Sequence, residues 1–179
     1  MNTAYVYTIL IVLTAIERLI EVKVSNRNAK WSLEQGGTEY GRSHYPFMVV
    51  LHTVFLFACV GEVFYFEREV GTLWLVLFTG LALGCQGLRW WCINTLGQRW
   101  NTRVIIVPNL PRVTGGPYQY INHPNYVVVA LEGIILPLVH QAWLTAICFT
   151  ILNAGLMLVR IRCENEALSK LLSLEVSHD

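Results

Sequence analysis

The chain has 179 residues, of which 54% are hydrophobic and only 14% are charged. Soluble domains carry about 25% charged residues, so this composition indicates a protein whose solvent is lipid. The net charge of +1, with no cluster of basic residues on a polar face, excludes a nucleic-acid-binding surface. The five cysteines show no CxxC spacing, so neither a disulfide framework nor a metal site is expected.

The first apolar run is predicted to be a retained helix. It has no basic leader and continues into Glu17, Arg18 and Glu21 without a small-residue cleavage site, unlike a signal peptide. Five segments reach or approach the roughly 20 apolar residues that a spanning helix needs, and the fourth is short enough to be tilted, interfacial or one arm of a hairpin. We therefore predict one all-α integral membrane domain over residues 1–179, with helices at 3–24, 45–65, 71–92, 125–139 and 142–160.

Charged residues predict the orientation of this bundle. Basic residues gather at 23–42, 89–112 and 160–170, whereas the 62–69 turn is acidic. The positive-inside rule places the basic regions in the cytoplasm. With an odd number of spans, the N-terminus is then expected outside.

Residues 94–124 form the longest stretch without a helical pattern. Loops of this length are usually functional or disordered, and the apolar and aromatic content here argues against disorder. Its "RVIIVP" run predicts a short strand or a buried extended segment. Irregular backbone near a membrane persists only where protein or a water-filled cavity satisfies its polar groups, so we expect a cytoplasmic cap folded around something polar.

The cap ends in "GGPYQYINHPNY" at 115–126, an unusually polar and ring-rich stretch for this chain. Gly115 and Gly116 allow a positive φ or a close approach to a ligand. Pro124 suits the first turn of a helix, and the preceding His123 meets the positive end of the helix dipole, which favours a neutral imidazole. The alternative interpretation is a capped helix entry with interfacial tyrosines.

Several polar residues lie inside apolar spans, where ionisable groups usually mark a functional interior. Glu132 could equally form a structural hydrogen bond, and Glu17 and Arg18 could simply pair near a helix end. Arg89, at the expected end of the third helix, either snorkels to the interface or points into a pocket. The set comprises Glu17, Arg18, His52, Gln86, Arg89, Glu132 and Asn153.

A charged segment, "RIRCENEALSKLL" at 160–172, directly follows the fifth helix. Its alternating charges at helical spacing are also typical of a solvated helix start with pairs such as Arg160–Glu164. Because this segment and the 115–126 stretch flank the last hairpin, both are expected on the same side of the membrane, together with Arg89.

"VTGGPYQYINHPNY" followed by "RIRCENEAL" resembles the C-terminal signature of the isoprenylcysteine carboxyl methyltransferase family: an Arg-His-Pro-x-Tyr block, a hydrophobic hairpin and paired acidic residues. The "ERLIEVKVSNRNAKW", "GGTEYGRSHYPFMVVLH" and "RWNTRVIIVP" stretches are similar to a compact bacterial branch. The resemblance implies an S-adenosylmethionine-dependent enzyme of the bacterial plasma membrane, with its active site on the cytoplasmic side. Members of that branch are associated with O-methylation of alkylpyrone or alkylresorcinol lipids.

The resemblance also implies roles for individual residues. Arg89 matches an arginine that the family places beside the reacting group of the substrate, and we assign a catalytic role to it and, as a base or orienting partner, to Glu132. The cofactor-binding residues that the resemblance implies are Gln98, Leu110, Val113, Gly116, Tyr118, His123, Pro124, Tyr126 and Glu164.

Three positions depart from the family pattern. Asn122 stands where the family usually has arginine, Asn165 replaces the second acid, and Leu110 replaces a histidine of the eukaryotic members. Because the first change removes a cation, a carboxylate substrate becomes less suited than a neutral or weakly acidic hydroxyl on a lipid ring. Arg89 near that oxygen would lower its pKa.

Three other functions remain alternatives. Carboxyl methylation of an isoprenylcysteine-like substrate stays open. An NADPH-dependent membrane reductase shares a related signature, but the short chain and the lack of a basic cluster for a 2′-phosphate argue against it. A non-enzymatic membrane subunit would explain the helices but not the polar stretch beside a charged segment. We expect a lipid substrate that enters from the bilayer.

Overall fold

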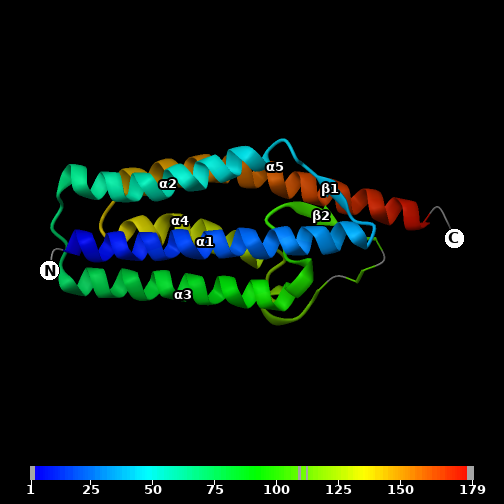
Figure 1. Ribbon diagram of the computed structural model, residues 1–179, viewed down its shortest axis with the longest axis horizontal. Helices are drawn as coiled ribbons and strands as arrows, with labels where there is room; N and C mark the ends of the chain where they lie inside the picture. Colours follow the sequence, from blue (N-terminus) through cyan, green and yellow to red (C-terminus); the bar gives the residue numbers. More distant parts are fainter. Residues whose placement is uncertain (1–2, 109, 112, 177–179) are drawn as a thin grey trace.

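A computed structural model describes residues 3–108, 110–111 and 113–176 and shows a helical bundle with a small cap (Figure 1). The all-α membrane fold is confirmed, because four helices are long and apolar enough to span a membrane and α4 is a shorter apolar helix. The four long helices are α1 (Thr3–Glu34), α2 (Tyr45–Phe66), α3 (Thr72–Leu96) and α5 (Trp143–Val176), and the shorter α4 spans Pro124–Leu138. The cap holds η1 (Gly97–Arg99), β2 (Val104–Ile106) and η2 (Gly116–Gln119), and β1 (Thr38–Tyr40) pairs with β2.

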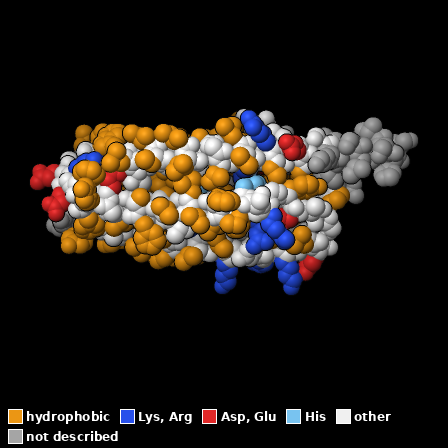
Figure 2. All heavy atoms as spheres, turned by 90° about the horizontal axis from the view of Figure 1, so that it is seen from above, with side chains coloured by type: hydrophobic (Ala, Val, Ile, Leu, Met, Phe, Trp, Pro, Cys, Tyr) orange, Lys and Arg blue, Asp and Glu red, His pale blue; other side chains and the backbone are white. Residues whose placement is uncertain are grey.

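The helices run side by side along the long axis of the molecule. The N-terminus and the α2–α3 and α4–α5 turns lie at one end, which we call the outer end, and the cap lies toward the other end (Figure 1). Hydrophobic side chains cover much of the bundle, and most of the visible Lys and Arg side chains lie toward the cap end (Figure 2). Arg112 and the side chain of Lys170 lie outside the described residues.

α1 is longer than expected, since it continues past residue 24 to Glu34. Its apolar run ends near residue 24, but its last three turns bury polar side chains against the cap instead of stopping at the membrane surface. The Asn28 amide donates to the Gly97 and Trp100 carbonyls at 3.0 and 2.8 Å, and the Ser25 hydroxyl accepts from the Thr102 amide at 2.9 Å. The extension therefore supports the start of the cap.

α3 and α5 also exceed their expected bounds. α3 runs to Leu96 and not to residue 92, so Arg89 lies two turns before the helix end and not at it. α5 runs without a break from Trp143 to Val176, so the charged 160–172 segment continues the spanning helix and is not a separate helix start. Both errors arise because apolar patterning marks where lipid ends, whereas the backbone stays helical beyond it.

The outer end is closed by a buried carboxylate. Glu62, in the last turn of α2, accepts hydrogen bonds from the backbone amides of Leu144 and Thr145 at 3.2 and 2.7 Å. It also pairs with Arg68 at 2.8 Å. Glu62 thus binds backbone amides that the first turn of a helix leaves without partners. These amides belong to α5, directly after the turn that was expected at 137–143.

The cap contains the expected short strand. β2 lies within the "RVIIVP" run and pairs antiparallel with β1, an unpredicted strand, with Glu39 opposite Ile105. Gly116 has a φ of +54°, one of the two possibilities considered for both glycines, whereas Gly115 has an ordinary φ of −88°. A Cβ on Gly116 would lie 2.5 Å from the Thr95 hydroxyl, so this glycine lets η2 pack closely on α3.

We expect Gly116→Ala to lower the free energy of unfolding by at least about 1–2 kcal/mol, because a left-handed φ is costly for an L side chain and the new methyl group would meet Thr95. Gly115→Ala is the matched control, since nothing lies within 4 Å of its Cβ position. Thermal unfolding in detergent measures both variants. Equal midpoints for the two would contradict this account of η2.

Candidate active site

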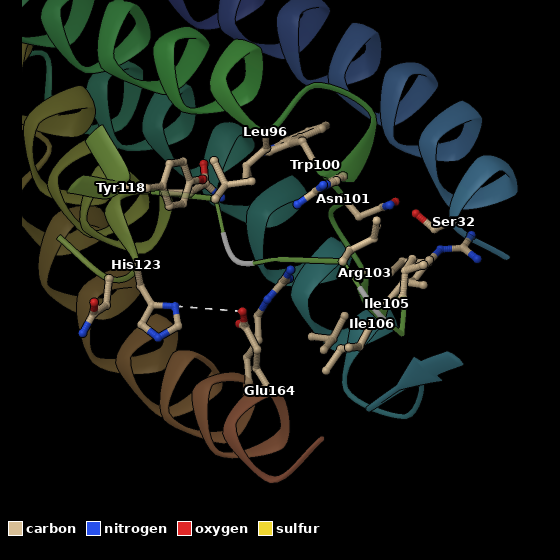
Figure 3. A pocket seen from close by; sticks show the side chains of 18 of the residues that line it. Ser32, Leu96, Trp100, Asn101, Arg103, Ile105, Ile106, Tyr118, His123 and Glu164 are labelled. Atoms are coloured by element: carbon tan, nitrogen blue, oxygen red, sulfur yellow. Dashed lines mark ion pairs between the residues drawn. The ribbon is translucent and has the colours of Figure 1, made fainter. Parts of the chain in front are cut away.

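A large cavity, the cap cavity, lies between the cap and the cytoplasm-facing ends predicted for α3, α4 and α5. Its volume is about 880 Å³, within the range of small-molecule and cofactor sites. Trp100, Arg103, Ile105 and Ile106 reach it from the cap, while His123 and Glu164 come from the start of α4 and from α5 (Figure 3). Residues far apart in the sequence therefore share one hollow.

Four buried polar atoms around this cavity have no hydrogen-bond partner among the described residues. They are the donors Trp100 Nε1, Asn101 Nδ2 and Arg103 Nε and the acceptor Asn125 Oδ1. Buried polar groups in proteins are nearly always hydrogen-bonded, and leaving one unpaired costs about 1–3 kcal/mol. Because the four residues all line one cavity, its wall is a candidate binding site for a polar ligand.

A connected group of side chains joins α4 to α5 at the cavity wall. The Tyr126 hydroxyl donates to Glu164 Oε2 at 2.5 Å and accepts from Arg160 Nε at 2.9 Å. The His123 ring stacks on Tyr126 with centroids 5.3 Å apart, and its Nδ1 lies 4.0 Å from Glu164 Oε1. Arg160 also donates to the Thr102 carbonyl at 2.6 Å. Arg160 and Glu164 are therefore both bound to Tyr126. The interpretation of these two residues as a simple ion pair on a helix surface did not include this contact.

The structure brings most of the predicted cofactor residues to this cavity. Pro124 and Gly116 do not line it and have structural positions instead: Pro124 is the first residue of α4, directly after His123, as predicted. Gln98 is exposed on η1 and also lies outside the lining. Those that line the cavity are Leu110, Val113, Tyr118, His123, Tyr126 and Glu164.

Two titratable groups near the cap end of the bundle, Tyr118 and His44, have shifted pKa values. Burial, with contributions from Cys92 and Glu164, raises the pKa of the Tyr118 hydroxyl well above its ordinary value. Burial and the nearby Arg160 guanidinium lower the pKa of His44. Tyr118 therefore faces the cap cavity as a protonated donor, and His44 favours its neutral form.

A second cavity, the bundle cavity, lies between the helices and has a volume of about 250 Å³. Its wall is mainly apolar and includes Leu56, Leu136 and Phe149, together with the charged Arg89 and Glu132. Four residues line both hollows, which therefore adjoin. They are Trp100, Asn125, Tyr126 and Arg160.

An ionic network borders the bundle cavity. Arg89 is 8% exposed and holds Glu21 through Nε and Nη2 at 2.6 and 2.8 Å. Its Nη1 lies 3.4 Å from Glu132 Oε2, while Glu132 Oε1 accepts from Arg18 and from Gln86 at 2.6 and 2.9 Å. Arg89 thus points into the bundle and does not snorkel, and it shares one cavity with Glu132.

The same network resolves the Glu17–Arg18 alternative. Those two side chains do approach each other, at 3.9 Å, but Arg18 also binds Glu21 at 2.5 Å, and Glu17 accepts a hydrogen bond from the Trp90 indole. They belong to an interior network that links α1 to α3 and α4 and are not an isolated pair near a helix end.

Sequence reasoning assigned no role to several of these residues. Glu21 was visible as a carboxylate one turn after Glu17, a spacing that places both on one helix face, and this signal could have identified it as a partner for a buried cation. The three unpaired donors lie in the "RWNTRVIIVP" stretch and the unpaired acceptor lies in "GGPYQYINHPNY", but nothing in either stretch marked these atoms as lacking partners. The residues missed are Glu21, Trp100, Asn101, Arg103 and Asn125, whereas Arg160 was noted only as a possible helix-surface pair with Glu164.

These features define a membrane protein with a polar ligand pocket at one end of its bundle and an adjoining apolar pocket inside it. A profile of the isoprenylcysteine carboxyl methyltransferase (ICMT) family matches residues 69–170, and the chain belongs to this family. It is also 37% identical over 164 residues to the uncharacterized protein YpbQ of Bacillus subtilis (strain 168), covering 92% of this chain and 97% of that relative. Membership makes the protein a membrane methyltransferase, in a family that in general uses S-adenosylmethionine.

Proposed function

We propose that this protein is an S-adenosylmethionine-dependent O-methyltransferase that acts on a membrane lipid, with the hydroxyl of an alkylpyrone- or alkylresorcinol-type molecule as its acceptor. The observation that carries the proposal is the cap cavity with its four unpaired buried polar atoms, adjoining an apolar cavity inside the bundle. A polar cofactor and an apolar acceptor require two adjoining cavities of this kind, one polar and one apolar, that share a wall.

The residues of the cap cavity fit S-adenosylmethionine. The unpaired donors of Trp100, Asn101 and Arg103 suit the acceptor atoms of the adenine, ribose and carboxylate groups. Glu164 and the Asn125 oxygen suit hydroxyl and ammonium donors, and His123 offers a ring face beside them. When bound, the cofactor supplies an electrophilic methyl group on a positively charged sulfur.

The bundle cavity suits a lipid acceptor. Its rim includes Leu19, Val22 and Val49, which are exposed on α1 and α2 within the apolar bundle surface. An acyl chain can therefore enter from the bilayer between these two helices, while the polar head of the lipid reaches the wall shared with the cap cavity. This arrangement supports substrate entry from the side and not from the aqueous phase.

The ion pairs of Arg18 and Arg89 favour a hydroxyl over a carboxylate, although Arg160, which also lines the bundle cavity, gives its wall one positive charge in excess. Arg18 and Arg89 are both already paired with Glu21 and Glu132, so a carboxylate bound beside them would also be repelled by these two carboxylates. A neutral or weakly acidic hydroxyl needs no such counter-ion when it binds. Together with asparagine at position 122, this pairing makes carboxyl methylation the weaker alternative.

Arg89 and Glu132 have distinct proposed roles. The Arg89 guanidinium stabilises negative charge as it develops on the acceptor oxygen, because a fixed donor in a dry site acts more strongly than one in water. Glu132 accepts bonds from Arg18, Gln86 and Arg89, so its geometry supports an orienting partner more than a base. The basic residues at the cap end support an active site on the cytoplasmic side of the plasma membrane, with the N-terminus outside.

The experiment that tests the proposal is calorimetric titration of the detergent-purified protein with S-adenosylhomocysteine, the demethylated product. We expect saturable binding near one equivalent, and no competition by NADPH. Thermal unfolding in the same detergent shows that the sample is folded. A folded protein that binds NADPH and not S-adenosylhomocysteine would favour the reductase, and one that binds neither would favour a non-enzymatic subunit.

A further inference from the structure

His52 lies in the wall of the bundle cavity and has one ring nitrogen to spare. It lies in the middle of α2, and its Nδ1 is 2.8 Å from the backbone carbonyl of Met48. Because a carbonyl only accepts, Nδ1 carries the proton of the neutral ring, and Nε2 keeps its lone pair. Among the described residues none forms a hydrogen bond with Nε2. The ring is held edge-on against Phe149, with centroids 5.2 Å apart.

The carboxylates, the arginines and Tyr126 of this cavity are less suited to accept a proton, and His44 is the one other imidazole among its described lining residues. Both carboxylates are occupied, Glu21 by Arg18 and Arg89 and Glu132 by Arg18, Arg89 and Gln86. Arginine does not lose its proton in proteins, and the Tyr126 hydroxyl donates to Glu164. The titratable residues that line this cavity together with His52 are Arg18, Glu21, His44, Tyr45, Arg89, Tyr126, Glu132 and Arg160.

We propose that Nε2 of His52 is the general base that removes the proton of the acceptor hydroxyl, an inference that rests on the proposed function. The acceptor O–H bond breaks and its proton forms the N–H bond of His52. The oxygen electron pair forms the new O–CH₃ bond as the S–CH₃ bond of the sulfonium donor breaks, and that electron pair remains on the sulfur. The positive charge thus passes from sulfur to the imidazolium, which later releases its proton.

This role makes a specific demand on the acceptor. A phenol has a pKa near 10, so it is protonated at neutral pH and needs a base. A 4-hydroxypyranone is a vinylogous acid that ionises below neutral pH and needs none. A carboxylate acceptor would likewise leave His52 without a proton to remove. A general base at His52 therefore implies that the acceptors bound in the bundle cavity are lipids whose hydroxyl is still protonated when they bind.

The test compares wild-type protein and His52→Asn on two acceptors with equal alkyl chains, a 5-alkylresorcinol and a 6-alkyl-4-hydroxy-2-pyranone. The asparagine amide can still donate to the Met48 carbonyl, but it cannot accept a proton. We expect kcat/KM at pH 7 to fall about 100-fold or more for the resorcinol and only a few-fold for the pyranone. The loss for the resorcinol should shrink as the pH approaches 10, where the phenol ionises unaided.

His140→Asn is the matched control, because it removes a buried histidine at the outer end, away from both cavities. It should leave the ratio of the two kcat/KM values unchanged. Equal losses of His52→Asn on both acceptors would overturn the assignment in favour of a structural role, as would no loss on either. If folded wild-type protein binds S-adenosylhomocysteine but methylates neither acceptor, the proposed acceptor class fails and the assignment of His52 fails with it.

A second measurement is independent of turnover. Nitrogen NMR of histidine-labelled protein should show His52 as the tautomer protonated at Nδ1. With S-adenosylhomocysteine bound, adding the alkylresorcinol should shift the Nε2 resonance, because the phenol donates to that nitrogen. A ring protonated at Nε2, or an Nε2 chemical shift that does not change when the alkylresorcinol is added, would contradict the proposal.

Discussion

Replacing Arg89 by lysine should lower kcat about 100- to 1000-fold, the loss typical of removing one preorganised donor at a developing oxyanion, while the affinity for S-adenosylhomocysteine stays within a few-fold. Lysine keeps the positive charge between Glu21 and Glu132, but a compact ammonium group cannot hold a carboxylate in two places and still point at the acceptor. Steady-state kinetics with saturating cofactor, combined with calorimetry, measure the two effects separately.

Lysine is preferred to alanine here because the network is buried. Removing one partner of a buried ion pair outright costs about 3–5 kcal/mol, so Arg89→Ala could lose activity simply by unfolding. Arg68→Lys makes the same exchange in the ion pair with Glu62 at the outer end and should leave kcat unaltered. A folded Arg89→Lys protein with wild-type kcat would remove Arg89 from the reaction.

His123→Ala should instead act on the cofactor. We expect the dissociation constant of S-adenosylhomocysteine to rise about tenfold or more, equivalent to at least about 1.4 kcal/mol, because the cap cavity loses the ring that stacks on Tyr126 and faces Glu164. The His123 side chain is 29% exposed, so its removal should leave the fold intact. At saturating cofactor, kcat should remain within a few-fold of the wild-type value.

His140→Ala is the control for this substitution, since His140 lies at the outer end and bonds Thr3 at 3.1 Å. Its folded fraction should bind S-adenosylhomocysteine with wild-type affinity. An exchange of phenotypes, in which Arg89→Lys loses the cofactor and His123→Ala loses only kcat, would contradict both role assignments and reverse the functions we propose for the two cavities.

The expected and observed sites agree best where the signal is local. Pro124 starts α4 and His123 precedes it because a fixed φ and a missing amide proton suit the first turn of a helix. The alternatives left open for Arg89 could not be resolved in the same way. Whether a cation at a helix face snorkels or turns inward depends on a partner, and its partner Glu21 is 68 residues away in the sequence.

The sequence by itself determined that this is a helical membrane protein, where most of its spans begin, and which stretch forms the cap. The reason is that the free energy of placing a segment in lipid depends mainly on that segment's own side chains. Only the tertiary structure decided that α1 extends to Glu34 to support the cap, that Arg89 joins Glu21 and Glu132, and that four buried polar atoms around the cap cavity lack partners among the described residues. The reason is that a hydrogen bond or ion pair requires two groups to meet, and distant groups meet only through packing.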